Sequence, residues 1–253
     1  MKIKKSLCVC RKGWLTMKFD ILTLFPDMFK AILDESIIGR AQEKGVIEIN
    51  TINIRDFSKN KHKKADDYPY GGGNGLVMMT QPIYDAYLSI IEKLEYKPRV
   101  IYLSPQGKPF DQKQAERLKE TEHLILLCGH YEGIDERIIE EIVDEEISLG
   151  DFVLTGGEIP AMALIDCVSR LIPGVLSCEE SYAEESHYHG LLEFPQYTRP
   201  YEFNGRKVPD VLMSGHHANI IEWRKMQSLK RTLEKRPDLY EKFSLLEKEK
   251  EKS

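Results

Sequence analysis

Three glycine-bearing segments stand where the sequence predicts strands to end, and they are the first candidates for a binding site. They are residues 104–107 (Ser-Pro-Gln-Gly), 128–135 (Cys-Gly-His-Tyr-Glu-Gly-Ile-Asp) and 149–158 (Leu-Gly-Asp-Phe-Val-Leu-Thr-Gly-Gly-Glu). Ligands of open α/β sheets bind beyond the carboxyl ends of the strands, and glycine lets backbone approach a ligand closely. The segments therefore predict one shared pocket, although turn formation alone would also explain their glycines.

This predicted pocket does not have a familiar nucleotide fingerprint. The sequence contains no GxxxxGK[ST] phosphate loop, and no GxGxxG stands between a predicted strand and a helix. The glycines from Gly71 to Gly75 resemble the second motif only superficially, because no strand leads into them. These observations argue against a P-loop nucleotidase and against a dinucleotide-dependent oxidoreductase.

Acidic side chains collect in an irregular segment, 173–209, that shows no sustained period. Its first glutamates are Glu179, Glu180, Glu184 and Glu185. They form either a solvated acidic loop or the source of a general base whose pKa is adjusted by its surroundings. The histidines nearby occur as HxH and HH pairs without a zinc signature. The five cysteines include no CxxC, which favours reduced thiols in a cytosolic protein.

Two basic clusters are interleaved with aromatic residues. The first spans residues 55–64, the second lies on a predicted helix that contains Trp223, and residues 197–206 between them add tyrosines and arginines. Basic groups contact phosphates and aromatic rings stack on splayed bases, which is how proteins grip unpaired RNA. A solvated charged surface is the alternative, and the net charge of -5 argues against a uniformly basic coat.

Apolar periodicity predicts alternating strands and helices. Strands are expected at 18–24, 46–54, 99–103, 123–128 and 146–149, and helices at 26–45, 81–94, 111–120, 134–143, 158–171, 215–236 and 237–248. Single helices between strands imply a mostly parallel sheet that is covered on both faces. The expected fold class is therefore α/β, with a small helical domain at the carboxyl end.

The chain of 253 residues is expected to have four parts. Residues 1–16 form a basic extension outside the fold, 17–175 the α/β domain, 176–190 a linker and 191–253 the helical domain. The extension lacks the apolar stretch of a signal peptide, and no apolar run reaches the ~18 residues of a membrane helix. A soluble, cytoplasmic protein without a membrane partner is expected.

Taken together and in this order, the motifs resemble those of the bacterial tRNA (guanine-37-N1)-methyltransferases, a family of the knotted SPOUT class. The resemblance covers roughly residues 17–240. The motifs that carry it are Asp20-Ile-Leu-Thr-Leu-Phe-Pro, Pro69-Tyr-Gly-Gly-Gly-Asn-Gly, Tyr102-Leu-Ser-Pro-Gln-Gly, the segments 128–135 and 149–161, Arg170-Leu-Ile-Pro-Gly-Val-Leu, Gly190-Leu-Leu-Glu-Phe-Pro-Gln-Tyr-Thr-Arg-Pro and Ser214-Gly-His-His-Ala-Asn-Ile.

The resemblance implies a trefoil-knotted domain that binds S-adenosylmethionine, and a homodimer whose tRNA and cofactor contacts come from both subunits. The methyl group would go to N1 of guanine-37 in the tRNA anticodon loop. The cofactor-binding residues that it implies are Tyr102, Leu103, Ser104, Pro105, Gln106, Gly107, Gly129, Tyr131, Glu132, Gly133, Leu149, Gly150, Asp151, Phe152, Val153, Leu154, Gly156, Gly157 and Pro160.

The resemblance also assigns catalytic roles. It places the catalytic carboxylate on Glu185 and the positive partner of the target guanine on Arg170. The family has Asp where this chain has Glu185, which keeps the acid/base chemistry but reaches one methylene further; Glu184 is the alternative base. Glu132 matches the family residue tied to a possible Mg²⁺ requirement. The tRNA-binding residues that we expect are Tyr197, Arg199, His216, Asn219, Trp223 and Arg224.

Two other classes of protein compete with this interpretation. A non-catalytic RNA-binding protein would need the basic clusters but not the three glycine segments. A cofactor-binding oxidoreductase would need a dinucleotide fingerprint. Neither alternative predicts binding of S-adenosylmethionine, so that measurement separates them from a methyltransferase.

Overall fold

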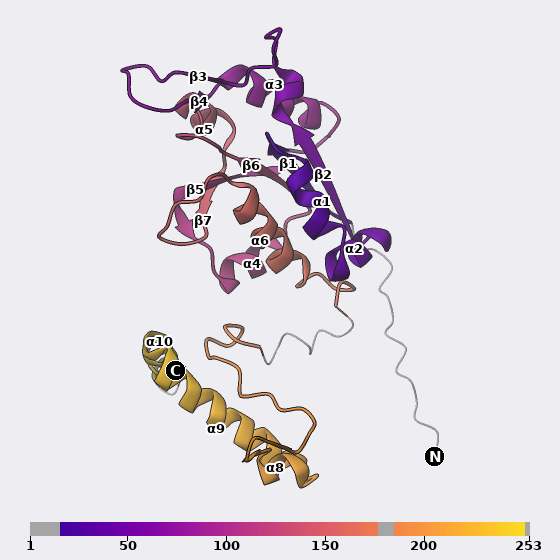
Figure 1. The fold of residues 1–253 in the computed structure, drawn as a ribbon, viewed down its shortest axis with the longest axis vertical. Helices are drawn as coiled ribbons and strands as arrows, with labels where there is room; N and C mark the ends of the chain where they lie inside the picture. Colours follow the sequence, from indigo (N-terminus) through magenta and orange to yellow (C-terminus); the bar gives the residue numbers. More distant parts are fainter. Residues whose placement is uncertain (1–15, 177–184, 251–253) are drawn as a thin grey trace. The chain divides into compact units, whose positions relative to one another are not determined.

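The computed structural model describes residues 16–176 and 185–250, and the chain divides into two compact units, 1–177 and 178–253 (Figure 1). The predicted extension lies outside the described residues except for Thr16, whose hydroxyl donates a hydrogen bond of 2.9 Å to the carbonyl oxygen of Gly45. The predicted linker, 176–190, lies partly outside them.

The first unit is built around a five-stranded parallel sheet with the strand order β2-β1-β6-β5-β7. This confirms the predicted α/β class. Every residue of the central strand β6 is buried, because strands flank it and helices cover both faces, so its sequence is continuously apolar rather than alternating. The strands are β1 (Met17–Thr23), β2 (Ile47–Asn53), β5 (Arg99–Pro109), β6 (His123–Cys128) and β7 (Glu145–Ser148).

Helices cover the sheet in two groups (Figure 1). On one face α3 (Thr80–Ile91) contacts α5 (Glu136–Ile142), and on the other α1 (Asp27–Leu33) and α4 (Gln112–Leu118) both contact α6 (Glu158–Ser169). The predicted cap of α4 is confirmed, since the carboxylate of Asp111 accepts a hydrogen bond of 2.9 Å from the backbone N–H of Gln114.

The single helix predicted over residues 26–45 is wrong. The structure has α1 and then a second helix, α2 (Ser36–Glu43), because the backbone of Glu35 is extended. The break changes which side chains face the core, so that Ile38 and Ala41 are buried while Ile37 is exposed. The apolar spacing that suggested one helix therefore belongs to two different helical faces.

Short strands that were not predicted occur in two regions. A 3₁₀ helix (η1, Ile54–Phe57) precedes β3 (Asp66–Asp67), which pairs with β4 (Val77–Met78) in antiparallel fashion, and β8 (Glu202–Phe203) pairs likewise with β9 (Arg206–Lys207). The turn between β8 and β9 is Asn204-Gly205, with φ of 51° and 75°. Asn-Gly favours this hairpin geometry, but strands of two residues are too short to show an apolar period.

The second unit consists of α8 (Asp210–Met213), α9 (His217–Lys235) and α10 (Pro237–Lys250), preceded by the segment 185–209. That segment is tied to α9. The buried hydroxyl of Thr232 accepts a hydrogen bond of 2.9 Å from the backbone N–H of Leu192, and the hydroxyl of Ser228 donates to the carbonyl oxygen of Leu192. The helical character predicted for this part of the chain is confirmed; the trefoil knot stays a prediction.

A buried polar cluster ties β1 to β6 at the amino ends of the strands. The Asp20 carboxylate lies 2.8 Å from Nε2 of His123 and accepts a second hydrogen bond, of 3.0 Å, from the Asn50 side chain on β2. The hydroxyl of Tyr96 lies 3.2 Å from Nδ1 of the same histidine. Both ring nitrogens of His123 are therefore engaged inside the fold, where an unpaired polar group would be costly.

Replacing Asp20 tests this cluster. Asp20→Ala should lower the free energy of unfolding by about 2–3 kcal/mol, because it leaves buried Nε2 of His123 without its partner and Asn50 with Glu48 as its remaining acceptor. Urea unfolding curves measure the change. Asp27→Ala is the control, because the ion pair of Asp27 with Lys30 is exposed to solvent and therefore weak. This substitution should leave the unfolding curve nearly unchanged. Equal effects of the two substitutions would contradict the role of the buried cluster.

Candidate active site

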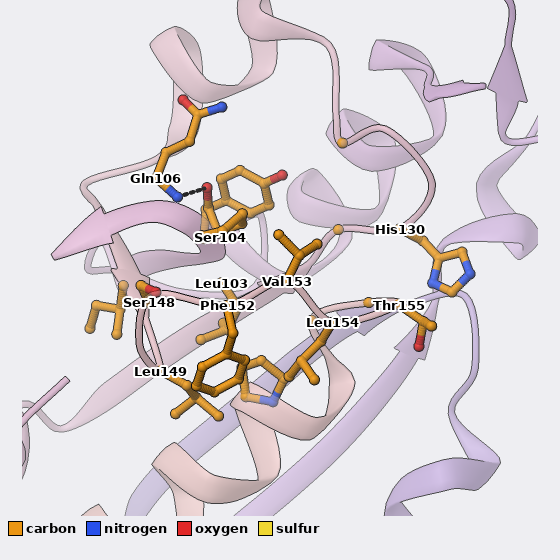
Figure 2. A pocket seen from close by; sticks show the side chains of 18 of the residues that line it. Leu103, Ser104, Gln106, His130, Ser148, Leu149, Phe152, Val153, Leu154 and Thr155 are labelled. Carbon is orange, nitrogen blue, oxygen red and sulfur yellow. Dashed lines mark hydrogen bonds between the residues drawn. The ribbon is translucent and has the colours of Figure 1, made fainter. Parts of the chain in front are cut away.

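A cavity of about 210 Å³ lies at the carboxyl ends of β5, β6 and β7 (Figure 2). Its walls come from an irregular stretch within β5, from the loops that follow β6 and β7, and from the first turn of α6. The three glycine segments thus line one cavity at the sheet edge where α/β proteins bind ligands.

The structure brings most of the predicted cofactor residues together around this cavity. Only Gly107, Gly150 and Asp151 do not line it. Sequence reasoning missed four lining residues, all of which lie inside the motifs or at the end of β7. They are His130, Ile147, Ser148 and Thr155.

The first wall is a break in the pairing of β5 with β7. Ile147 of β7 lies opposite both Leu103 and Lys108, so residues 104–107 leave the ladder and border the cavity. The hydroxyl of Ser104 accepts a hydrogen bond of 3.1 Å from the backbone N–H of Gln106 (Figure 2). A Cβ at Gly107 would lie 2.5 Å from the backbone of Ile147. Gly107 therefore serves close packing against β7 rather than the cavity wall.

The second wall follows β6 and packs against a buried tyrosine. A Cβ at Gly129 would lie 2.8 Å from the ring and from the hydroxyl oxygen of Tyr102. Burial raises the pKa of Tyr102 to about 12, and the negative charge of Glu146 adds to the rise. The hydroxyl consequently keeps its proton at neutral pH and remains a hydrogen-bond donor beside the cavity.

The third wall is the start of α6, which approaches the end of β6 backbone to backbone. The N–H of Gly157 donates a hydrogen bond of 2.8 Å to the carbonyl oxygen of Gly129, and a Cβ at Gly157 would lie 2.8 Å from Cα of Cys128. Burial raises the pKa of the Cys128 thiol well above its usual value, and the nearby Glu158 carboxylate adds to the rise. This cysteine is a packing residue and not a nucleophile.

A buried carboxyl group supports the floor below these walls. Glu158 is 2% exposed and accepts a hydrogen bond of 2.8 Å from the hydroxyl of Thr23 at the end of β1. A Cβ at Gly156 would meet both this carboxyl group and Nδ1 of His130. Within the described residues, that buried nitrogen has no hydrogen-bond partner. Gly156 thus leaves room for two polar side chains to approach each other.

The two predicted catalytic residues belong to different units. Arg170 ends α6 in the first unit, where it is half-buried and its N–H donates a hydrogen bond of 3.1 Å to the carbonyl oxygen of Asp166. Glu185 belongs to the second unit, and the hydroxyl of the following Ser186 accepts a hydrogen bond of 3.0 Å from the N–H of Glu193. Their pairing stays a prediction. Glu179, Glu180 and the alternative base Glu184 lie outside the described residues.

The predicted tRNA-binding residues lie on the second unit. The rings of Tyr197 and Trp223 are 6.3 Å apart, and the guanidinium carbon of Arg224 lies 4.6 Å from the ring centroid of Phe194. His216 directly precedes α9, and Asn219 lies in the first turn of that helix. Arg199 precedes a cis proline. Trp223 and Arg224 are half-buried, whereas the other four are exposed.

The structure bears on metals and membranes as well. Glu132 is exposed at the edge of the cavity. Across residues 16–176 and 185–250, no three His, Cys, Asp or Glu side chains converge as they would around a metal ion. In the same part of the chain, no helix is both long and apolar enough to span a membrane.

Comparison with known proteins gives a consistent result. A family model described as tRNA (guanine-1)-methyltransferase TrmD matches residues 17–242. The tRNA (guanine-N(1)-)-methyltransferase of Ruminiclostridium cellulolyticum is 69% identical over 227 residues, which cover 90% of this chain and 97% of that protein. The protein of the same name from Alkaliphilus oremlandii is 60% identical over 238 residues, 92% and 96% of the two chains.

A double-mutant comparison distinguishes the atoms that restrict position 129 from those that restrict position 157. Gly129→Ala and Gly157→Ala should each lower the free energy of unfolding by about 1–3 kcal/mol, the usual range for overpacking. Adding Tyr102→Leu should recover part of the loss for Gly129→Ala, because it removes the ring atoms that the new methyl group meets. It should recover nothing for Gly157→Ala, which meets backbone.

Urea unfolding of the single and double variants measures both coupling energies. Tyr102→Leu alone supplies the reference. Equal coupling in the two pairs would show that the tyrosine ring is not what restricts position 129.

Proposed function

Because this chain belongs to the tRNA (guanine-1)-methyltransferase family, it methylates N1 of a guanine in tRNA, and we propose that S-adenosylmethionine donates the methyl group from the cavity beyond β5, β6 and β7. The observation that carries the proposal is that the three glycine segments line this single cavity. We further propose that the target is guanine-37 of the anticodon loop.

The cavity fits such a cofactor by the chemistry of its walls. Apolar side chains, among them Leu103, Leu149 and Phe152, offer surfaces for a ring and a thioether chain, and closely packed glycine backbone offers N–H and C=O groups to a purine edge. Phe152 and Val153 are exposed at the cavity rim, so a ligand seated there would cover apolar surface that now faces water. When bound, S-adenosylmethionine supplies a methyl group on a positively charged sulfur.

The chain's own task is to position the guanine and remove its N1 proton. Glu185 is the proposed base, and it accepts this proton as N1 becomes nucleophilic. Negative charge then develops toward O6 of the guanine, where the guanidinium of Arg170 stabilises it. The target guanine must also leave the stack of the anticodon loop to reach the cavity. Tyr197, Arg199, His216, Asn219, Trp223 and Arg224 are the proposed tRNA contacts.

Exposed apolar side chains on two touching helices support a homodimer. Phe25, Met28 and Ile32 are exposed on and just before α1, and Leu154 and Ile159 are exposed at the start of α6, which contacts α1. A second copy of the chain would cover this face. The dimer also supplies a way for Arg170 of one copy and Glu185 of the other to serve one site.

A magnesium requirement rests on Glu132 alone in this chain. Mg²⁺ is often held by one or two carboxylates together with water and substrate phosphates. The proposed role of Glu132 therefore requires ligands from the RNA, and the proton-transfer step above does not depend on it. A cytoplasmic location follows from the tRNA substrate.

The central experiment measures methyl transfer from S-adenosylmethionine to a tRNA transcript with guanine at position 37. Glu185→Gln keeps the size of the side chain but removes the base, so the rate should fall about 10²-fold or more. Cofactor and tRNA affinities should stay nearly intact. Glu185→Asp should keep part of the activity, since the carboxyl group remains on a shorter arm.

Two controls accompany this experiment. Glu184→Gln should lower the methyl-transfer rate only slightly. A transcript with adenine in place of guanine at position 37 should not be methylated. If Glu184→Gln is the damaging substitution, the neighbouring glutamate is the base. If wild-type protein methylates both transcripts equally, guanine-37 is not the target.

The proposed dimer is tested at its most exposed apolar side chain. Ile32 is 56% exposed on α1, so Ile32→Asp should not disturb the core but should place a charge in the interface. Light scattering after gel filtration should change from the mass of two chains to 29.3 kDa. Leu246→Asp, at a similarly exposed position on α10, is the control and should stay dimeric. A dimer retained by Ile32→Asp places the interface elsewhere.

A further inference from the structure

The loop between β3 and β4, residues 68–76, presents two tyrosines to solvent. Tyr70 is 100% exposed and Tyr68 is 77% exposed. Between Tyr70 and Gly75 the backbone takes positive φ at four glycines, and a Cβ at Gly71, Gly72 or Gly73 would meet no atom of the described chain within 4 Å. The tip can therefore adjust its shape, and its aromatic rings gain nothing from burial in the unit that carries them.

The base of this loop, in contrast, is fixed. The short ladder of β3 and β4 closes it, and Met78 at its end is fully buried. The backbone N–H of Met79 donates a hydrogen bond of 2.9 Å to the carbonyl oxygen of Ala65, which is also buried. In Figure 1 the loop projects outward beside β3 and β4. An adaptable aromatic tip thus stands on a rigid stem.

The stem is bound to the same backbone that lines the cavity. The N–H of Glu132 donates a hydrogen bond of 3.0 Å to the carbonyl oxygen of Leu76, and the N–H of Met78 donates one of 3.0 Å to the carbonyl oxygen of Gly133. A Cβ at Gly75 would meet the Glu132 side chain. Glu132, a residue of the cavity edge, therefore lies directly against the end of the tyrosine loop.

Positive charge accompanies the tyrosines. The exposed guanidinium of Arg137 pairs with the carboxylate of Asp135 at 2.7 Å, and the backbone N–H of Asp135 donates a hydrogen bond of 3.1 Å to the carbonyl oxygen of Met78 at the stem. Lys63 and Lys64 immediately precede the stem, and their ion pairs with Asp56 and Asp67 are exposed to solvent. Such surface pairs are weak, and phosphate groups can take the place of the carboxylates.

We propose that Tyr70 stacks on an unpaired base of the tRNA anticodon loop next to the methylated guanine, with Tyr68 and the neighbouring cations holding the backbone of that nucleotide. The inference rests on the proposed function. When the target guanine enters the cavity past Glu132, the adjacent nucleotide of the RNA lies at the loop of residues 68–76. Aromatic rings accept any base by stacking, so this contact favours an open loop over a paired stem rather than one sequence.

The test compares Tyr70→Ala with wild type in fluorescence anisotropy titrations of an anticodon stem-loop RNA. Loss of one base–aromatic stack should weaken binding at least about five-fold. Tyr70→Trp should restore affinity, because it keeps an aromatic face, whereas Tyr70→Leu should not. The dependence of affinity on salt should keep its slope, because no phosphate contact is removed. A changed slope would instead assign Tyr70 a part in phosphate binding and overturn the stacking role.

A second readout locates the contact. With 2-aminopurine placed beside the target guanine, wild-type protein should quench its fluorescence more strongly than Tyr70→Ala does. Tyr96→Ala removes a half-exposed tyrosine at the opposite end of the sheet and is the matched control, expected to leave RNA affinity unchanged. Melting temperatures of all variants confirm that each is folded.

The outcomes separate the inference from the function on which it rests. If wild-type protein methylates the RNA and Tyr70→Ala binds it as tightly, the stacking contact is wrong while the function stands. If Tyr70→Ala turns a dimer into a monomer, the loop faces a second copy of the chain and the inference is overturned. If wild-type protein neither binds nor methylates the RNA, the proposed function fails first.

Discussion

The close approach of α6 to the end of β6 is the constraint on which the rest of the site depends. Gly157 donates a hydrogen bond to the carbonyl oxygen of Gly129, and neither the Cα of Cys128 nor the N–H of Gly129 leaves room for a Cβ at position 157. This contact fixes the start of the helix against the loop that follows β6. Both the first turn of α6 and that loop line the cavity, so close backbone contact sets the distance between two of its walls.

Buried polar contacts hold the central sheet at both ends. At the carboxyl ends, Glu158 of α6 accepts a hydrogen bond from Thr23 of β1. At the amino ends, Asp20 of β1 contacts His123 of β6. Each pair would cost free energy if one partner were missing, so they favour a single register of β1 against its neighbours. The contact of Thr23 with Glu158 also holds the first turn of α6, which lines the cavity, against β1.

The fold could be predicted where the sequence has long apolar segments. The bounds of β6 agree with prediction because a run of buried apolar residues has one interpretation once its length is that of a strand. The break between α1 and α2 could not be predicted, since the local backbone of Glu35 decides it. At the site, glycine content located the cavity but did not distinguish a packing glycine, Gly107, from lining ones. That distinction depends on how closely β7 approaches.

The proposed catalytic pair could not be inferred from local spacing for a different reason. Arg170 and Glu185 belong to units that are separate along the chain, so no spacing rule relates them. The division has a consequence under the proposed mechanism. Arg170 directly follows α6, the helix whose first turn lines the cavity, so its place is fixed by packing within the first unit. Glu185 belongs to the other unit, so its place at the N1 proton of the guanine depends on how that unit and the RNA are bound, and not on the packing that forms the cavity.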